Sequence, residues 1–237
     1  MQAMKNFLKM YKWYELVFML VSFIALITLG IIFRGDNIYL LVFELISTIC
    51  GLVAAMTNFK RKKYAFIFYS VYVTIYGIIS FFNKQYGEGV INLAFNLPLY
   101  LYTLYKLYFK IKDNNSEFQI NSLNLKGWII IIVFIPVVTV GYGFLLKYLN
   151  SSLPFENALA TSLALIAAFL ASKTIKEQWL FFLFYSIVLT YIWTSNYVNG
   201  GTSGFTYLVL NIIYIIFNLY GFILWYKLAK KPKEIKE

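Results

Sequence analysis

Long, continuously apolar runs are the feature that most limits the fold of this chain. Of its 237 residues, 61% are hydrophobic and only 13% are charged. A helix of about 20 apolar residues crosses the hydrocarbon core of a bilayer, and continuous runs favour helices over the alternating strands of a barrel. The sequence therefore predicts an all-α integral membrane protein with eight transmembrane helices, at residues 16–33, 38–58, 64–82, 89–109, 127–148, 157–173, 178–195 and 205–227.

The distribution of the basic residues predicts an orientation. If the N-terminus is cytoplasmic, only Arg34, Lys84 and Lys147 fall on the outer side, and the other 18 of the 21 Lys and Arg residues fall inside. Positive residues gather on the cytoplasmic side of membrane proteins. We therefore expect a multi-pass protein of the inner (plasma) membrane with both termini cytoplasmic. The net charge of +11 then needs no nucleic-acid partner.

Three segments occur twice and in the same order. The first pair is offset by 113 residues, the second by 116 and the third by 119. Repeats of this kind mark transporters, whose substrate site lies near mid-membrane between the halves. The pairs are Glu44–Ala55 (ELISTICGLVAA) with Asn157–Ala168 (NALATSLALIAA), Phe68-Tyr69-Ser70 with Phe184-Tyr185-Ser186, and Asn92-x-x-Phe95 with Asn211-x-x-Tyr214.

The repeat predicts a domain plan. An N-terminal helix precedes a 3+1+3 core, and the single linker helix makes both triplets enter the membrane in the same direction, as in SWEET-like folds. The expected parts are residues 1–37 (basic N-terminus and extra helix), 38–110 (first repeat), 111–150 (loop and linker helix), 151–228 (second repeat) and 229–237 (basic tail).

Polar side chains within the apolar spans are the first candidates for a binding site. Asn92 and Asn96 share one helical face, as do Asn211, Tyr214 and Asn218. An unpaired amide in hydrocarbon costs several kcal/mol, so these groups should face the interior. They either bond neighbouring helices or bind a polar ligand, and their presence in both repeats favours the ligand.

Aromatic residues near these amides predict a slot for a flat ring. Trp179, Phe182 and Tyr185 form a stripe on the seventh span that continues to Thr190, and Tyr69 belongs to a similar stripe on the third span. We include all five among the candidate substrate-binding residues. Aromatic faces and amides together suit a ring-bearing solute better than a simple ion.

Glu44 is the acidic residue that the predicted spans place well inside the membrane, whereas Glu88 falls at a span end. A buried carboxyl group is a functional candidate by default. Glu44 could carry a proton, bind substrate or hold a structural hydrogen bond. If it is structural, no coupling-ion site is evident, which favours facilitated diffusion.

Metal and enzyme chemistry have little support in the sequence. The chain has one cysteine, Cys50, and no histidine, which excludes a metal site built from histidines or several cysteines. Too few buried acid and base groups remain for acid–base catalysis, and no phosphate-binding loop motif occurs. We expect no metal, no cofactor and no enzymatic activity.

The motifs, taken in order, resemble those of the PnuC-type vitamin transporters over roughly residues 38–228. The resemblance rests on Glu44-Leu45, Tyr86-Gly87-Glu88 before Asn92-x-x-Phe95, Asn157-Ala158 with Lys173 and Glu177-x-Trp179, and Asn218-Leu219-Tyr220-Gly221-x-x-x-Trp225. It implies uptake of nicotinamide riboside or a related vitamin or nucleoside by facilitated diffusion with alternating access. It also implies a SWEET-like fold, a homotrimer, and a cytoplasmic kinase that traps the substrate.

The resemblance has two departures. Members that carry nicotinamide riboside have W-x-x-W-x-x-W where this chain has Trp179-x-x-Phe182-x-x-Tyr185, and Pro98 replaces a Y-G-W element. A deoxyribonucleoside therefore stays open as substrate beside nicotinamide riboside, and so do thiamine and riboflavin. The alternative class is a substrate-binding membrane subunit of an energy-coupled vitamin importer.

Overall fold

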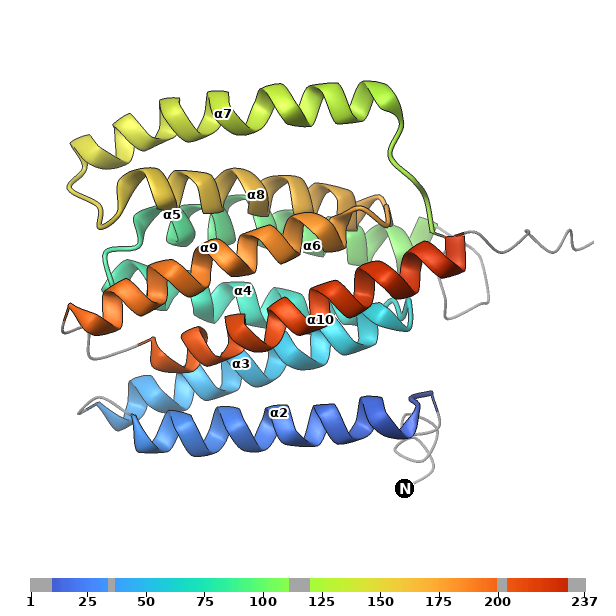
Figure 1. Ribbon diagram of the computed structural model, residues 1–237, viewed down its shortest axis with the longest axis horizontal. Helices are drawn as coiled ribbons and strands as arrows, with labels where there is room; N and C mark the ends of the chain where they lie inside the picture. The colour runs from blue at the N-terminus through green and yellow to red at the C-terminus, as the bar shows by residue number, and fades with distance from the viewer. Residues whose placement is uncertain (1–9, 34–36, 111–119, 200–203, 230–237) are drawn as a thin grey trace, which may run out of the picture.

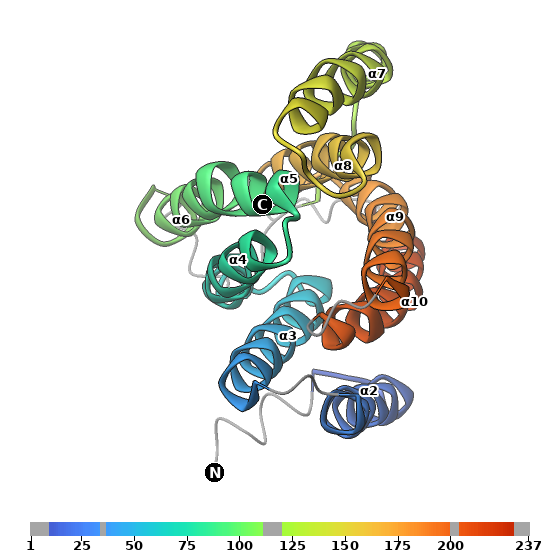
Figure 2. The same cartoon turned by 90° about the vertical axis from the view of Figure 1, so that its left-hand side faces the viewer.

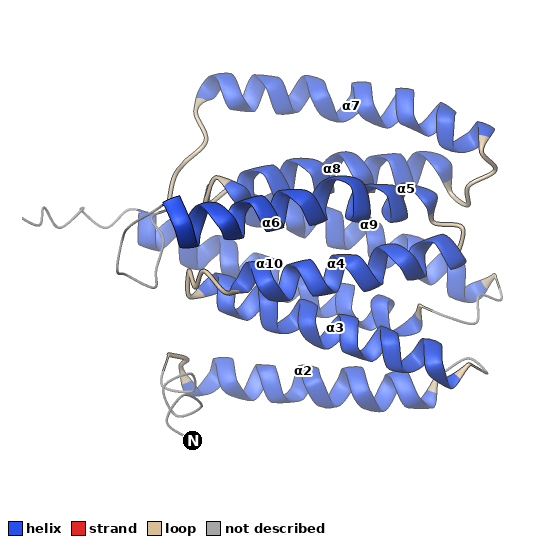
Figure 3. Ribbon diagram, turned by 180° about the vertical axis from the view of Figure 1, so that it is seen from behind, coloured by secondary structure: helices blue, strands red, loops and turns tan. Residues whose placement is uncertain are grey.

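The computed structural model describes residues 10–33, 37–110, 120–199 and 204–229, and these form a bundle of helices (Figures 1 and 3). Within them, seven helices are long and apolar enough to cross a membrane. Their ends differ from the predicted spans by no more than three residues. They are α2 (Trp13–Ile32), α3 (Ile38–Phe59), α4 (Ala65–Phe82), α7 (Leu125–Tyr148), α8 (Pro154–Ser172), α9 (Gln178–Val198) and α10 (Phe205–Ala229).

The segment predicted as the fourth span is helical but is not one regular α-helix. It consists of α5 (Tyr86–Val90), the π-helical stretch η1 (Ile91–Asn96), α6 (Leu97–Tyr105) and a second π-helical stretch η2 (Lys106–Lys110). Proline lacks the N–H group that a regular helix requires, and Pro98 is the second residue after η1. The helical segment begins three residues before the predicted span 89–109 and reaches Lys110, and the count of eight spans stays a prediction.

Seven of the described α-helices close into a ring. Seen end-on in Figure 2, α3 contacts α4, α4 contacts α5 and α6, these contact α8, and the ring continues through α9 and α10 back to α3. α2 packs outside the ring against α3 and α10, and α7 packs on the opposite side against α8. The ring therefore contains both predicted triplets, and the predicted extra helix and linker helix lie outside it.

The two triplets begin with the same structural unit. The turns after α3 and α8 carry the same backbone hydrogen bonds at an offset of 113, and Arg61 and Thr174 have positive φ angles of 56° and 55°. α4 and α9 also begin 113 residues apart. The predicted offset of 116 for these helices is therefore not their structural register. The matched bonds run from Arg61 N–H to Asn58 O and from Thr174 N–H to Ala171 O, and from Lys62 N–H to Thr57 O and from Ile175 N–H to Leu170 O.

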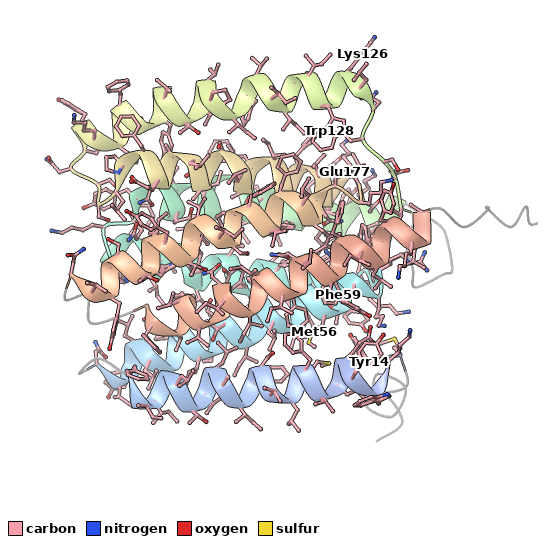
Figure 4. All side chains as sticks on the ribbon, viewed as in Figure 1. Tyr14, Met56, Phe59, Lys126, Trp128 and Glu177 are labelled. Carbon is pink, nitrogen blue, oxygen red and sulfur yellow. The ribbon has the colours of Figure 1, made fainter. Side chains whose placement is uncertain are left out.

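The basic segments gather at one end of the bundle. Lys60 forms an ion pair with Glu15 at 2.8 Å, joining the start of α2 to the turn after α3. Leu123 N–H donates to Glu177, which joins the chain before α7 to the turn after α8. Figure 4 shows Lys126 and Glu177 toward this end. The arrangement fits the predicted cytoplasmic face.

Gly221 allows three helices to approach closely at that end. A Cβ added to Gly221 would lie 2.7 Å from the Trp179 ring and 2.8 Å from the Phe59 ring. Trp179 is fully buried, and its ring stands edge-on to that of Trp225, with 5.5 Å between the ring centroids. Small residues at such positions let membrane helices pack closely.

Gly221→Ala should therefore destabilise the protein by about 1–3 kcal/mol through overpacking. Gly141→Ala is the matched control, because an added Cβ there meets nothing within 4 Å and both changes gain similar helix propensity. Thermal unfolding in detergent should show a lower melting temperature for Gly221→Ala alone. Equal melting temperatures would contradict the packing described here.

Candidate functional site

A cavity of about 40 Å³ lies inside the ring of helices. Its wall comes from α3, α4, η1, α6, α8, α9 and α10, so both triplets contribute. The lining residues are Ala55, Tyr69, Tyr72, Val73, Asn92, Asn96, Tyr100, Ala164, Phe182, Tyr185, Ser186, Tyr214 and Asn218. The structure thus brings seven of the predicted site residues together: Tyr69, Asn92, Asn96, Phe182, Tyr185, Tyr214 and Asn218.

The part of the wall that α4 and α9 form consists of residues at matching positions in the two repeats. The pairs are Tyr69 with Phe182, Tyr72 with Tyr185, and Val73 with Ser186, and each keeps the offset of 113. Aromatic pairs within the wall are also ordered. Tyr69 stacks on Tyr100 with 5.2 Å between ring centroids, and Tyr72 meets Tyr214 edge-on at 6.5 Å. Such faces accept a flat ring by stacking.

The amide part of the wall comes from η1 and α10. Asn92 Nδ2 donates to the Glu88 carbonyl at 2.8 Å, and Asn96 Nδ2 donates to Asn92 Oδ1 at 3.1 Å. Asn218 Nδ2 donates to Ser186 Oγ at 3.0 Å and so joins α10 to α9. Asn96 Oδ1 is buried and has no hydrogen-bond partner within the protein. This oxygen can accept a hydrogen bond from a ligand.

Glu88 is a buried carboxylate that the sequence analysis placed at a span end. Its helix begins at Tyr86 rather than at residue 89, and its side chain is 0% exposed. Glu88 Oε2 accepts hydrogen bonds from the hydroxyls of Tyr185 (2.5 Å) and Tyr76 (3.2 Å). Glu88 Oε1 has no partner within the protein. The Tyr-Gly-Glu stretch before Asn92 was the sequence signal for this residue.

The structure places three other predicted site residues away from the cavity. Trp179 packs at the basic end among Phe59, Trp225 and Gly221. Thr190 Oγ1 donates to a carbonyl of its own helix at 2.7 Å. Asn211 Nδ2 donates to Tyr207 O at 2.8 Å, and Asn211 does not line the cavity.

Glu44 has a structural setting. Its Oε1 accepts the Gly204 N–H at 2.8 Å and its Oε2 accepts the Thr206 hydroxyl at 2.6 Å. The carboxylate thus satisfies backbone and side-chain donors at the start of α10, where a negative charge is favourable. Both oxygens are paired far from the cavity wall.

A larger cavity of about 170 Å³ lies outside the ring, between α2, α3 and α10. It is lined by Tyr11, Tyr14, Glu15, Phe18, Met56, Phe59, Ile216, Phe217 and Tyr220. Figure 4 shows Tyr14, Met56 and Phe59 on this side of the bundle. One wall of this cavity comes from α2, which lies outside the ring, and only α3 and α10 of the two triplets contribute to it. The smaller cavity is lined entirely by segments of the two triplets. The smaller cavity is therefore the better candidate for transport.

The central cavity is contracted. Pockets that hold a drug-sized ligand measure about 300–1,000 Å³, and 40 Å³ has room for only a few water molecules. A solute with an aromatic ring therefore requires a wider cavity than this one. The described residues contain no group of three or more acidic, cysteine or histidine side chains that could hold a metal ion.

Comparison with known proteins identifies the family. The profile of a family described as nicotinamide mononucleotide transporters matches residues 41–227, which is most of the chain. The chain belongs to this PnuC family of membrane transporters. It is therefore classed with transporters and not with enzymes.

Two curated PnuC relatives are named nicotinamide riboside transporters. The protein of Neisseria mucosa is 22% identical over 190 residues, which cover 78% of this chain and 72% of the relative. The protein of Haemophilus influenzae is 24% identical over 189 residues, which cover 79% and 80%. A crystal structure of the vitamin B3 transporter PnuC matches with a TM-score of 0.78, 20% identity and 93% coverage of both chains, which shows a shared fold.

Two of the three positions in the W-x-x-W-x-x-W pattern face the central cavity in this PnuC-family chain. Phe182 and Tyr185 line it, whereas Trp179 does not. The hydroxyl of Tyr185 bonds Glu88. The departures from the pattern therefore fall in the wall of the cavity itself, and the remaining indole has a packing role.

Asn96→Leu should weaken ligand binding about tenfold or more and leave the fold intact. It removes an amide from the cavity wall, and a lost hydrogen bond in a buried site costs about 1–3 kcal/mol. Binding of nicotinamide riboside to purified protein would measure the effect. Thr190→Val is the matched control, since its hydroxyl bonds only its own helix. Equal binding by both variants would contradict the assignment of this cavity.

Proposed function

We propose that this protein takes up nicotinamide riboside or a closely related ring-bearing nucleoside across the inner membrane. The observation that carries the proposal is the composition of the central cavity. Its wall holds five tyrosines, a phenylalanine and three asparagines from both triplets, and none of the described residues that line it is a lysine or arginine. Aromatic faces stack on a base, and amides and phenol hydroxyls pair with ribose hydroxyls.

The cavity favours the riboside over the mononucleotide of the family description. A phosphate group brings nearly two negative charges and is recognised in proteins by Arg, Lys or helix N-termini. The described residues that line the cavity include neither arginine nor lysine, and the carboxyl group of Glu88 lies behind the wall. A phosphorylated ligand would therefore bind poorly.

The route is facilitated diffusion by alternating access, with a cytoplasmic kinase trapping the product. Hydrogen bonds join the two triplets on both sides of the cavity. Tyr185 meets Glu88 on one side, and Asn58 Nδ2 donates to Gln178 Oε1 at 3.4 Å near the basic end. Opening one side while the other stays joined would expose the cavity alternately. The pairing of Glu44 with Gly204 and Thr206 supports a structural role for that carboxylate, without ion coupling.

The arrangement in the membrane belongs to the same proposal. We count eight spans, with Tyr86–Lys110 as the fourth, and the SWEET-like division 1–37, 38–110, 111–150, 151–228 and 229–237. Residues 1–9, 34–36, 111–119, 200–203 and 230–237 of these parts lie outside the described residues. α2 begins and α10 ends at the basic end (Figure 1), which supports cytoplasmic termini. Assembly as a homotrimer rests on the family resemblance.

The test is counterflow in liposomes that contain the purified protein and no ATPase. Radiolabelled nicotinamide riboside should exchange saturably. Unlabelled nicotinamide riboside should inhibit the exchange, and the mononucleotide should not. Thiamine, riboflavin and a deoxyribonucleoside serve as further competitors, because these substrates are the alternatives within the family.

The outcomes separate the competing functions. Exchange inhibited best by another competitor would replace nicotinamide riboside with that solute. Absence of exchange for every solute, from folded protein, would overturn facilitated diffusion and favour the substrate-binding subunit of an energy-coupled importer.

A further inference from the structure

Glu88 differs from the other buried carboxyl groups among the described residues, Glu44 and Glu177. Glu44 has both oxygens paired with donors, and Glu177 accepts the Leu123 N–H and lies 3.9 Å from the Lys176 ammonium group. Glu88 has one oxygen without a partner within the protein, although the side chain is fully buried. Hydrogen bonds within the protein therefore do not fully account for a carboxyl group at this buried position.

The partners of Glu88 connect it to the cavity wall. Oε2 accepts hydrogen bonds from Tyr185 at 2.5 Å, Tyr76 at 3.2 Å and Asn92 at 3.5 Å. Tyr185 and Asn92 line the cavity, and Tyr76 stacks on the lining residue Tyr72 with 5.4 Å between ring centroids. Glu88 thus orients side chains of the wall from directly behind it.

No partner of Glu88 is a cation. All three are uncharged donors, which can stabilise a carboxylate but do not balance its charge. A buried carboxylate is costly unless an opposite charge lies nearby, and none of the described residues that line the cavity is a lysine or arginine. The tyrosine faces of the wall also attract cations through their ring quadrupoles. A ligand with a positive ring would satisfy both features at once.

We infer that Glu88 is a positioning residue that gives the central cavity its charge selectivity, so that a flat ring carrying positive charge binds more tightly than an uncharged ring of nearly the same shape. The inference rests on the proposed function and adds the chemical class of ring that this site prefers. Glu88 acts through its negative charge and through the orientation of Tyr185 and Asn92.

The test compares two ligands that differ mainly in charge. Nicotinamide riboside carries a pyridinium cation, and its reduced dihydropyridine form is uncharged with the same ribose. Binding of each to purified protein would be measured by titration in detergent. The wild-type protein should prefer the cation by about tenfold or more, which corresponds to about 1.4 kcal/mol.

Glu88→Gln keeps the shape of the side chain and removes the charge. It should remove most of the preference by weakening the cation about tenfold, with a change of less than about threefold for the reduced form. Glu44→Gln is the matched control, because it neutralises another buried carboxylate away from the cavity, and it should keep the wild-type preference. Glu88→Asp should retain part of the preference.

Each outcome decides the inference. Equal wild-type affinities for the two ligands would overturn it whether or not Glu88→Gln folds. Equal weakening of both ligands by Glu88→Gln would show a purely structural role and would also overturn it. If folded wild-type protein binds neither ligand, the proposed function fails and the inference fails with it. A preference that Glu88→Gln abolishes and Glu44→Gln retains would establish it.

Discussion

Within a bilayer, a polar side chain must find its partners inside the protein, and this constraint organises the whole bundle. Water is not available there, and an unpaired buried polar group costs several kcal/mol. The amides of Asn92, Asn96 and Asn218 therefore point into the ring, and the outer faces of α2 and α7 carry large exposed apolar side chains. The interior that results is polar enough to recognise a solute and narrow enough to exclude bulk water.

The helices of the ring pack closely against one another because small residues recur on α3 and α8. Ser47 and Gly51 on α3 and Ala160 and Ala164 on α8 are all buried. A Cβ on Gly51 would lie 2.5 Å from the hydroxyl of Tyr214, so this glycine lets a cavity-lining tyrosine approach α3. The small residue at position 51 therefore also helps to set the width of the cavity.

The sequence predicted the helices well because their signal is local. Apolar runs of about 20 residues located α2 to α4 and α7 to α10 to within three residues. The spacing of Asn92 and Asn96 also identified the face of η1 that lines the cavity. The spacing of Tyr214 and Asn218 identified the corresponding face of α10. Periodicity identifies a face because side chains three and four apart lie together.

Depth along a helix was harder to predict, because one helical face runs from one side of the membrane to the other. Trp179 and Phe182 share a face, but only Phe182 reaches the cavity, since Trp179 is a turn closer to the basic end. On α10, Tyr214 lines the cavity, whereas Asn211, about one turn away along the same face, does not. Depth is set by how the helices are staggered, which depends on contacts between distant parts of the chain.

Glu88 shows why a helix start matters for assigning charge. Hydropathy averaged over a window reports the apolar middle of a span and misses its first turn. In this chain that turn is folded inward, against α4 and α8, instead of extending into the aqueous loop. Gly87 permits this approach, because an added Cβ would lie 3.1–3.2 Å from Thr161, Asn157 and Leu146.

The cavity wall contains buried polar atoms that have no hydrogen-bond partner among the described residues. Asn96 Oδ1 and the Tyr214 hydroxyl belong to lining residues, and Glu88 Oε1 belongs to a residue behind the wall. A site built to bond donors of a substrate rejects analogues that lack them, because its own groups then stay unpaired. A cavity whose wall keeps such atoms unpaired gains free energy when a polar ligand pairs with them.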